Sequence, residues 1–163
     1  MSMNHIDKLS SFKVTEVELI YRNKVPASQR PLIQCSSDAY KILIKNWDLN
    51  RIELLEQFKI VLLDRRNACI GISEISTGGM TECIADPRIV FSTALKARAA
   101  YIILSHNHPS GNMKPSKQDF ALTERMITGG RIVGVEVIEH MIVAPETYYS
   151  FADEGIIPSC KWI

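Results

Sequence analysis

The sequence predicts a single α/β domain in which helices sandwich a mixed sheet. Helical and strand-like patterns alternate in the order helix, strands, helix, strand, helix, strands, which is typical of layered α/β architectures. The chain has 163 residues, 46% hydrophobic and 23% charged, enough apolar material for one core. We expect residues 1–35 to form an N-terminal tail and edge strand, and residues 36–163 to form the domain.

The N-terminal third predicts one strand and one helix. Residues 15–21 alternate between apolar and charged side chains, as a half-buried edge strand does. Residues 23–31 contain two prolines and indicate a loop. Ser36 or Ser37 can cap the helix that follows. The apolar face of this helix comprises Tyr40, Leu43, Ile44 and Trp47.

The middle of the chain predicts a hairpin and a second helix. Residues 57–63 form an apolar strand, and residues 68–76 return beside it after a polar turn. Residues 81–85 add a further strand. Asp86 followed by Pro87 is a strong helix start, with Asp as the cap and Pro at the first helical position.

The C-terminal part predicts a third helix and two strands. Ser116 begins the helix, and Gly129-Gly130 ends it, because glycine accepts the left-handed cap conformation. Residues 133–138 and 140–144 are strands on either side of a charged step. We expect residues 145–163 to form a short helix or a packed tail.

Two histidines follow a short apolar run, residues 100–104, which we interpret as a buried strand. Alternate residues of an extended chain point the same way, so His106 and His108 present their imidazoles side by side. After a turn rich in Pro and Gly, Ser116 opens a helix with Asp119 in its first turn. Two histidines, one carboxylate and a water make an open tetrahedral zinc site. The sequence therefore predicts Zn²⁺ bound by His106, His108 and Asp119.

Simpler roles remain open for each of these residues. His106 and His108 can be surface histidines in a polar turn. Asp119 stabilises a helix start by roughly 0.3–1 kcal/mol without any metal, and Ser116 can be the N-cap alone. A carboxylate can serve the helix and the metal at once.

The pattern His-x-His, seven residues, Ser, two residues, Asp resembles that of the JAMM (MPN+) zinc metalloproteases. Residues 106–111 and 115–119 are similar, more narrowly, to the RadC branch, and the resemblance covers about residues 36–144. It implies the JAB/MPN architecture, related to the cytidine-deaminase-like folds. It also implies a metallopeptidase-type hydrolase that cleaves peptide or isopeptide bonds with zinc-activated water, and a role for Ser116 in stabilising the tetrahedral intermediate.

A hydrolase of this type needs a general base. Spacing alone does not choose among the candidate glutamates, which are Glu53, Glu56, Glu74 and Glu82. The resemblance implies Glu56, which opens a segment similar to the family's Glu-x-Phe-x-Val-x-x-Leu-Asp, with Ile60 at the usual Val position. His140 follows Glu139 where RadC-like chains usually carry Asp-His. We expect His140 to be a core histidine or a partner of a ligand.

The alternative function is a DNA-repair-associated RadC-like binding protein with a structural or vestigial metal site. The net charge of +1 argues against strong general affinity for phosphate backbones. RadC-like proteins often carry an N-terminal helix-hairpin-helix domain. About 35 residues precede the matching region, so we expect a short form without that domain.

Other function classes lack their motifs. A nucleobase deaminase needs His-x-Glu and Pro-Cys-x-x-Cys, a metal-dependent nuclease needs a basic channel, and residues 77–80 lack the Gly-Lys-Ser/Thr of a phosphate loop. No apolar run has the length of a membrane span, and four widely spaced cysteines indicate reduced thiols in a cytoplasmic protein. The expected partner is a peptide or protein substrate, whose identity the sequence leaves open together with the oligomeric state.

Overall fold

The computed structural model describes residues 24–78 and 85–157. The edge strand expected at residues 15–21 lies outside these ranges, as does all but the last residue of the strand expected at 81–85. The described elements are, in chain order, η1 (Ala27–Gln29), α2 (Ser36–Lys45), β1 (Gln57–Leu63), β2 (Cys69–Thr77), α3 (Pro87–Lys96), β3 (Tyr101–Asn107), α4 (Lys117–Val133), β4 (Glu136–Val143) and β5 (Tyr148–Ser150).

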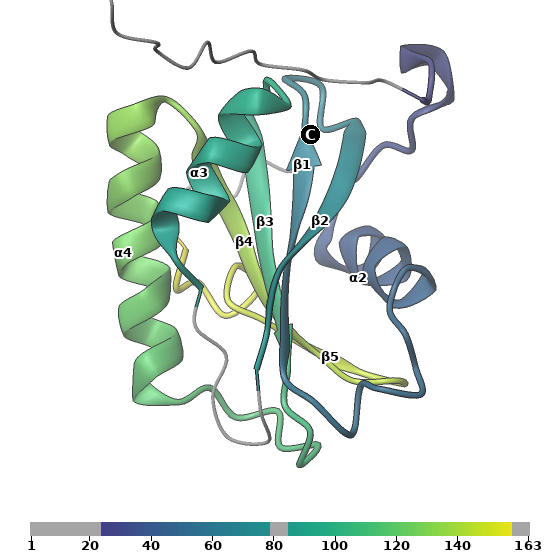
Figure 1. Cartoon of the computed structure of the whole chain (residues 1–163), viewed down its shortest axis with the longest axis vertical. Helices are drawn as coiled ribbons and strands as arrows, with labels where there is room; N and C mark the ends of the chain where they lie inside the picture. Colours follow the sequence, from purple (N-terminus) through teal and green to yellow (C-terminus); the bar gives the residue numbers. More distant parts are fainter. Residues whose placement is uncertain (1–23, 79–84, 158–163) are drawn as a thin grey trace, which may run out of the picture.

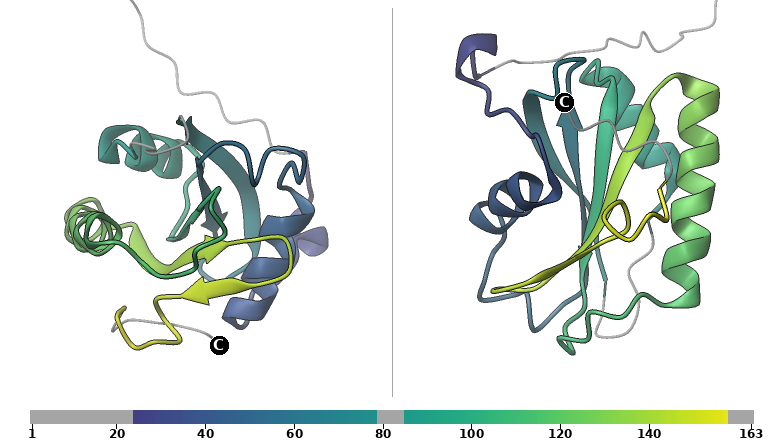
Figure 2. Two further views of the ribbon diagram at one scale, coloured as in Figure 1. Left: turned by 90° about the horizontal axis from the view of Figure 1, so that it is seen from below. Right: turned by 180° about the vertical axis from the view of Figure 1, so that it is seen from behind.

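One mixed sheet with the strand order β2-β1-β3-β4-β5 runs through the molecule. Strand β1 is antiparallel to both β2 and β3, β5 is antiparallel to β4, and β3 and β4 are parallel. A parallel pair needs a crossover connection, and α4 supplies it. Helix α2 covers one face of the sheet, whereas α3 and α4 cover the other (Figures 1 and 2). The predicted α/β sandwich is therefore confirmed.

Apolar side chains leave the sheet on both faces. Along β1, Phe58, Ile60 and Leu62 pack with α3 and α4, whereas Val61 and Leu63 pack on the α2 side. The strand is buried along its whole length, as a central strand covered on both faces should be. The expected strand at residues 57–63 has the bounds of β1, and the expected helix start at Asp86 and Pro87 begins α3.

Strand β4 contains a register shift. Its pairing with β3 skips Ile138, and an extra residue of this kind breaks the alternation of side chains between the two faces. Ile138 and Glu139 both lie on the α2 side, where Glu139 accepts a hydrogen bond from Ser36. His140 then points to the opposite face, toward Thr123 of α4. The expected division into two strands at this charged step was wrong, because β4 runs through it.

Two expected helix ends were also wrong. Helix α2 has Cys35 at its N-cap, and Ser36 is buried because its hydroxyl binds Glu139 rather than the helix start. Helix α4 passes through Gly129-Gly130 and ends at Gly134, whose φ is 73°. The glycine pair allows close packing: a methyl group on Gly129 would lie 2.9 Å from the Phe91 ring.

The C-terminal segment forms the short strand β5 followed by turns, where we expected a short helix or a packed tail; Phe151 there is buried. Cys35 and Cys69 are free thiols, and the other two cysteines lie outside the described residues. Among the described helices, none combines the length and the apolar character that crossing a membrane would require.

Candidate metal centre

Strand β3 delivers the first two predicted ligands. The strand extends beyond the expected end at residue 104 to Asn107, so His106 belongs to the sheet and pairs with Phe58 of β1. The imidazole of His106 is 2% exposed, on the α4 side of the sheet. His108 follows directly after the strand and is half-buried. A turn closes behind it, with Gly111 at a positive φ of 71°, and leads into α4.

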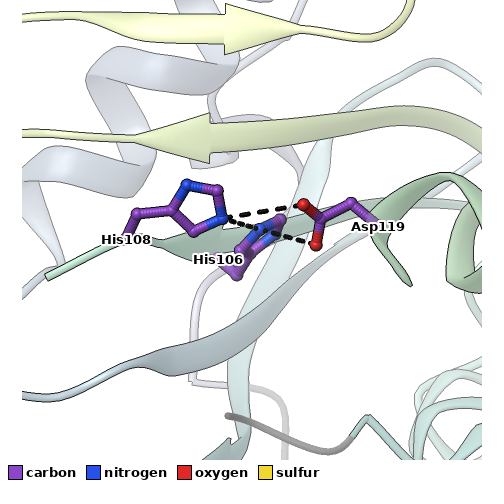
Figure 3. A group of neighbouring side chains, drawn as sticks. All are labelled: His106, His108 and Asp119. Atoms are coloured by element: carbon purple, nitrogen blue, oxygen red, sulfur yellow. Dashed lines mark hydrogen bonds and ion pairs between the residues drawn. The ribbon is translucent and has the colours of Figure 1, made fainter. Parts of the chain in front are cut away.

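The three predicted ligands meet in space, as Figure 3 shows. The Nε2 atoms of His106 and His108 are 3.0 Å apart. Asp119 Oδ1 lies 3.2 Å from His106 Nε2, and Asp119 Oδ2 lies 3.7 Å from His108 Nε2. Among the described residues, these three form the cluster with metal-binding donors.

The donor set fits a zinc ion. Zinc binds imidazole nitrogen and carboxylate oxygen at about 2.0–2.2 Å, so two ligands of a tetrahedral site are about 3.3 Å apart. The observed separations of 3.0–3.7 Å span this value. Each residue offers one ligand atom toward the others, and a fourth position would remain open. The triad could therefore hold a metal ion.

Helix α4 fixes the carboxylate through its first turn. Ser116 is the N-cap, and its Oγ accepts a hydrogen bond of 3.2 Å from the Asp119 amide. Asp119 Oδ2 in return accepts a bond of 2.6 Å from the Ser116 amide. This reciprocal pair is a capping box. The capping role foreseen for Ser116 is confirmed, and Asp119 serves the helix start and faces the imidazoles at once.

The electrostatics of the cluster favour an ionised Asp119. Burial alone would disfavour the charged carboxylate, but contacts with His106 and His108 hold the pKa of Asp119 well below its usual range. The bond with Asp119 correspondingly raises the pKa of His108, although burial opposes this shift. A negative carboxylate beside two imidazoles is a favourable environment for a divalent cation.

Glu56 lies at the same end of the sheet. It directly precedes β1, is half-buried, and its carbonyl accepts a hydrogen bond of 2.8 Å from the Gly78 amide. The antiparallel register that sets Phe58 opposite His106 brings Glu56 toward His108. The negative charge of Glu56 contributes to the raised pKa of His108. Of the candidate glutamates, Glu74 instead pairs with Lys59 at 3.4 Å, and Glu82 lies outside the described residues.

Comparison with known proteins agrees with this geometry. The model of the RadC-like JAB domain matches residues 33–156. The chain belongs to the RadC-like JAB domain family. It is 40% identical over 103 residues to a UPF0758 protein of Symbiobacterium thermophilum, covering 63% of this chain and 44% of that protein. It is 31% identical over 159 residues to a UPF0758 protein of Methanosarcina mazei, covering 96% of this chain and 68% of that protein.

A UPF0758 protein of Syntrophomonas wolfei is 43% identical over 102 residues, which cover 63% of this chain and 43% of that protein. The chain thus spans about half the length of several curated relatives that it matches. Their names state no activity, so the family assignment supports the fold and the JAB-type site without naming a reaction.

The RadC-like domain holds functional candidates that sequence reasoning missed. Asn107 is fully buried; its Oδ1 accepts a 2.8 Å bond from the Gln57 amide, and its Nδ2 donates to the carbonyls of Ile52 and Leu55. It thereby anchors the segment that carries Glu56. Its place between the two histidines was the available signal, but a polar residue at a strand end gives no hint of partners about fifty positions away.

Two hollows of about 460 and 470 Å³ lie at the other end of the RadC-like domain, near the start of β3. Arginines line them, including Arg98 and Arg131 close to the ends of α3 and α4. Cations at helix C-termini interact favourably with the helix dipole, so Arg98 and Arg131 have a structural role at these positions.

Proposed function

We propose that this chain is a zinc-dependent hydrolase of peptide or isopeptide bonds. The observation that carries the proposal is the convergence of His106, His108 and Asp119 within coordination range of one position. A zinc ion bound there would polarise a substrate carbonyl and lower the pKa of a water molecule. The substrate would be a peptide or protein, because amide hydrolysis is the reaction that the family resemblance implies.

The chain's own residues then have distinct tasks. His106, His108 and Asp119 hold the ion, and the sheet and the capping box keep their donors in place. Glu56 would accept a proton from the attacking water and transfer it to the nitrogen of the breaking amide bond, so that an acid and an amine leave. Its charge already acts on His108, which supports this assignment.

Ser116 would donate its hydroxyl hydrogen to the substrate oxygen that becomes negative during the reaction. Its Oγ accepts the Asp119 amide bond at 3.2 Å, and the residue is exposed. The hydroxyl hydrogen is therefore available for a second partner. The capping bond fixes the position of the oxygen, which is the preorganisation that such a donor needs.

The test compares the wild-type chain with Glu56→Gln, measuring zinc content by mass spectrometry and cleavage of a peptide library. We expect one zinc per chain in both proteins and cleavage by the wild type alone. Glu53→Gln is the matched control, because Glu53 is exposed and three positions away; it should cleave like the wild type. A wild-type chain without zinc, or a Glu56→Gln variant that cleaves as fast as the wild type, would overturn the proposal.

A further inference from the structure

A chain of buried hydrogen bonds joins two of the three metal ligands behind the site. Thr123 Oγ1 donates a hydrogen bond of 2.6 Å to the backbone carbonyl of Asp119. The same oxygen lies 2.7 Å from His140 Nδ1, and His140 Nε2 lies 3.0 Å from His106 Nδ1. Thr123 and His106 are each 2% exposed, and His140 is fully buried.

The single hydrogen of the Thr123 hydroxyl sets the direction of every other bond. Because that hydrogen goes to the Asp119 carbonyl, Thr123 can only accept from His140, so His140 carries its proton on Nδ1. A neutral imidazole has one donor and one acceptor nitrogen. His140 Nε2 must then accept, and His106 must donate from Nδ1.

We propose that Thr123 and His140 are positioning residues that keep the proton of His106 on Nδ1 and so present its Nε2 lone pair to the metal. This inference rests on the proposed function, since it concerns the same ion. The partners that fix the tautomer of a ligating histidine from behind are usually carboxylates, backbone carbonyls or water. Here a histidine, His140, fixes the tautomer of His106. Thr123, on the helix that carries Asp119, orients His140 in turn.

The register shift in β4 makes this relay, the chain of hydrogen bonds from Thr123 through His140 to His106, possible. Without the skipped Ile138, regular alternation would turn His140 to the α2 side of the sheet. The shift returns His140 to the face that carries His106, where it stacks on Phe151 with ring centroids 4.7 Å apart. A bulge that re-aims a side chain beside a functional site is a recurrent device of sheets.

The environment of His140 keeps it neutral. His140 is fully buried, and burial disfavours the charged form of an imidazole. The adjacent Glu139 carboxylate is occupied by Ser36 and Ser150 on the other side of the sheet. A charged His140 would donate from both nitrogens and force His106 to place its proton on Nε2, which would block coordination.

The first test reads the protons directly in the metal-free wild-type chain. Nitrogen–proton correlation spectra of ¹⁵N-histidine distinguish an imidazole protonated on Nδ1 from one protonated on Nε2. We expect Nδ1–H for His140 at neutral pH, because the Thr123 oxygen can only accept from it. Nε2–H on His140 would overturn the inference, whatever the affinity for zinc. If the expected proton were found but no zinc bound, the proposed function would fail while the tautomer assignment held.

The second test measures zinc affinity by competition with a chromophoric chelator. Thr123→Val keeps the side-chain shape but removes the hydroxyl, so nothing holds the His140 proton on Nδ1. We expect this variant to bind zinc about 10–100-fold more weakly than the wild type. Thr123→Ser should restore both the spectrum and the affinity. Met126→Leu, a buried change on the same helix outside the relay, should leave both unaltered. Wild-type affinity in Thr123→Val would contradict the inference.

Discussion

At the scale of single residues, the carboxylate of Asp119 serves the helix start and the ligand cluster at the same time. Oδ2 accepts the Ser116 amide at 2.6 Å, and Oδ1 lies 3.2 Å from His106. The helix start therefore orients the ligand, and a change at the cap alters both. This coupling allows the two roles of Ser116 to be separated by substitution.

Ser116→Ala should lower the free energy of unfolding by about 1 kcal/mol, because the Asp119 amide loses its cap. Ser116→Asp should recover that stability, since aspartate caps helices equally well, but it cannot donate a hydrogen to a substrate oxygen. Urea denaturation and peptide cleavage measured on both variants check this. Full cleavage by Ser116→Asp would show that the hydroxyl acts only as a cap.

The residues of the candidate site could be predicted because their signals are local. His106 and His108 alternate at a strand end, and Ser116 and Asp119 form a capping box three positions apart. The roles of Asn107 and Ser36 could not be predicted this way. Their partners lie 50 and 103 positions away in sequence, and only the folded sheet brings them together.

At the scale of elements, the glycine pair of α4 decides how closely the helix lies to its neighbours. Sequence reasoning placed the helix end at Gly129-Gly130, because glycine often ends helices. The structure uses these residues for close approach, and Gly134 makes the turn instead. A methyl group on Gly130 would collide with the Val135 carbonyl oxygen, which no local pattern reveals.

Gly130→Ala should therefore destabilise the chain by about 1–3 kcal/mol, the usual cost of overpacking, even though alanine favours helices. The matched control is Gly71→Ala, where a methyl group would meet nothing within 4 Å. That variant should stay within about 0.5 kcal/mol of the wild type, because the added methyl group creates neither a clash nor a cavity. Chemical denaturation of both proteins measures the difference, and equal stabilities would contradict the packing described for α4.

Asn107 joins the end of β3 to the segment before β1. Asn107→Ala removes three hydrogen bonds of a buried side chain, so we expect a loss of about 2–4 kcal/mol in unfolding free energy. It should also slow cleavage more than it weakens zinc binding, because the Asn107 side chain holds the segment that carries Glu56 and bonds to none of the three ligand side chains. Asn46→Ala is the control, since Asn46 is exposed and its side chain donates to the Ile42 carbonyl of the same helix. Unaltered cleavage by Asn107→Ala would contradict the role of Asn107 in holding the segment that carries Glu56.

At the scale of the whole molecule, buried Glu139 links three parts of the fold. Its carboxylate accepts hydrogen bonds from Ser36 at the start of α2, from Ser150 of β5 and from the amide of Ala152. Burial raises its pKa above the ordinary value, although these bonds oppose the shift. The layered arrangement was predictable from the order of patterns, but this polar link across the layers was not.

The raised pKa of Glu139 predicts a pH dependence of stability. As pH rises from about 4.5 toward the raised pKa, the unfolded chain loses the proton while the folded chain keeps it, so this contribution to stability falls. Glu139→Gln removes the titration. Across this window the unfolding free energy of the wild type should fall relative to that of the variant. Above the raised pKa the difference should become constant. A difference independent of pH would contradict the assignment.

All three candidate ligands come from residues 106–119, a short continuous stretch. A denatured chain therefore retains two neighbouring imidazoles and can still capture zinc weakly, unlike sites assembled from distant strands. Because ligand-induced stabilisation depends on preferential association with the native state, the melting temperature should rise less on zinc addition than the native dissociation constant alone implies. With excess metal the rise in melting temperature should level off, because the denatured chain then binds zinc as well.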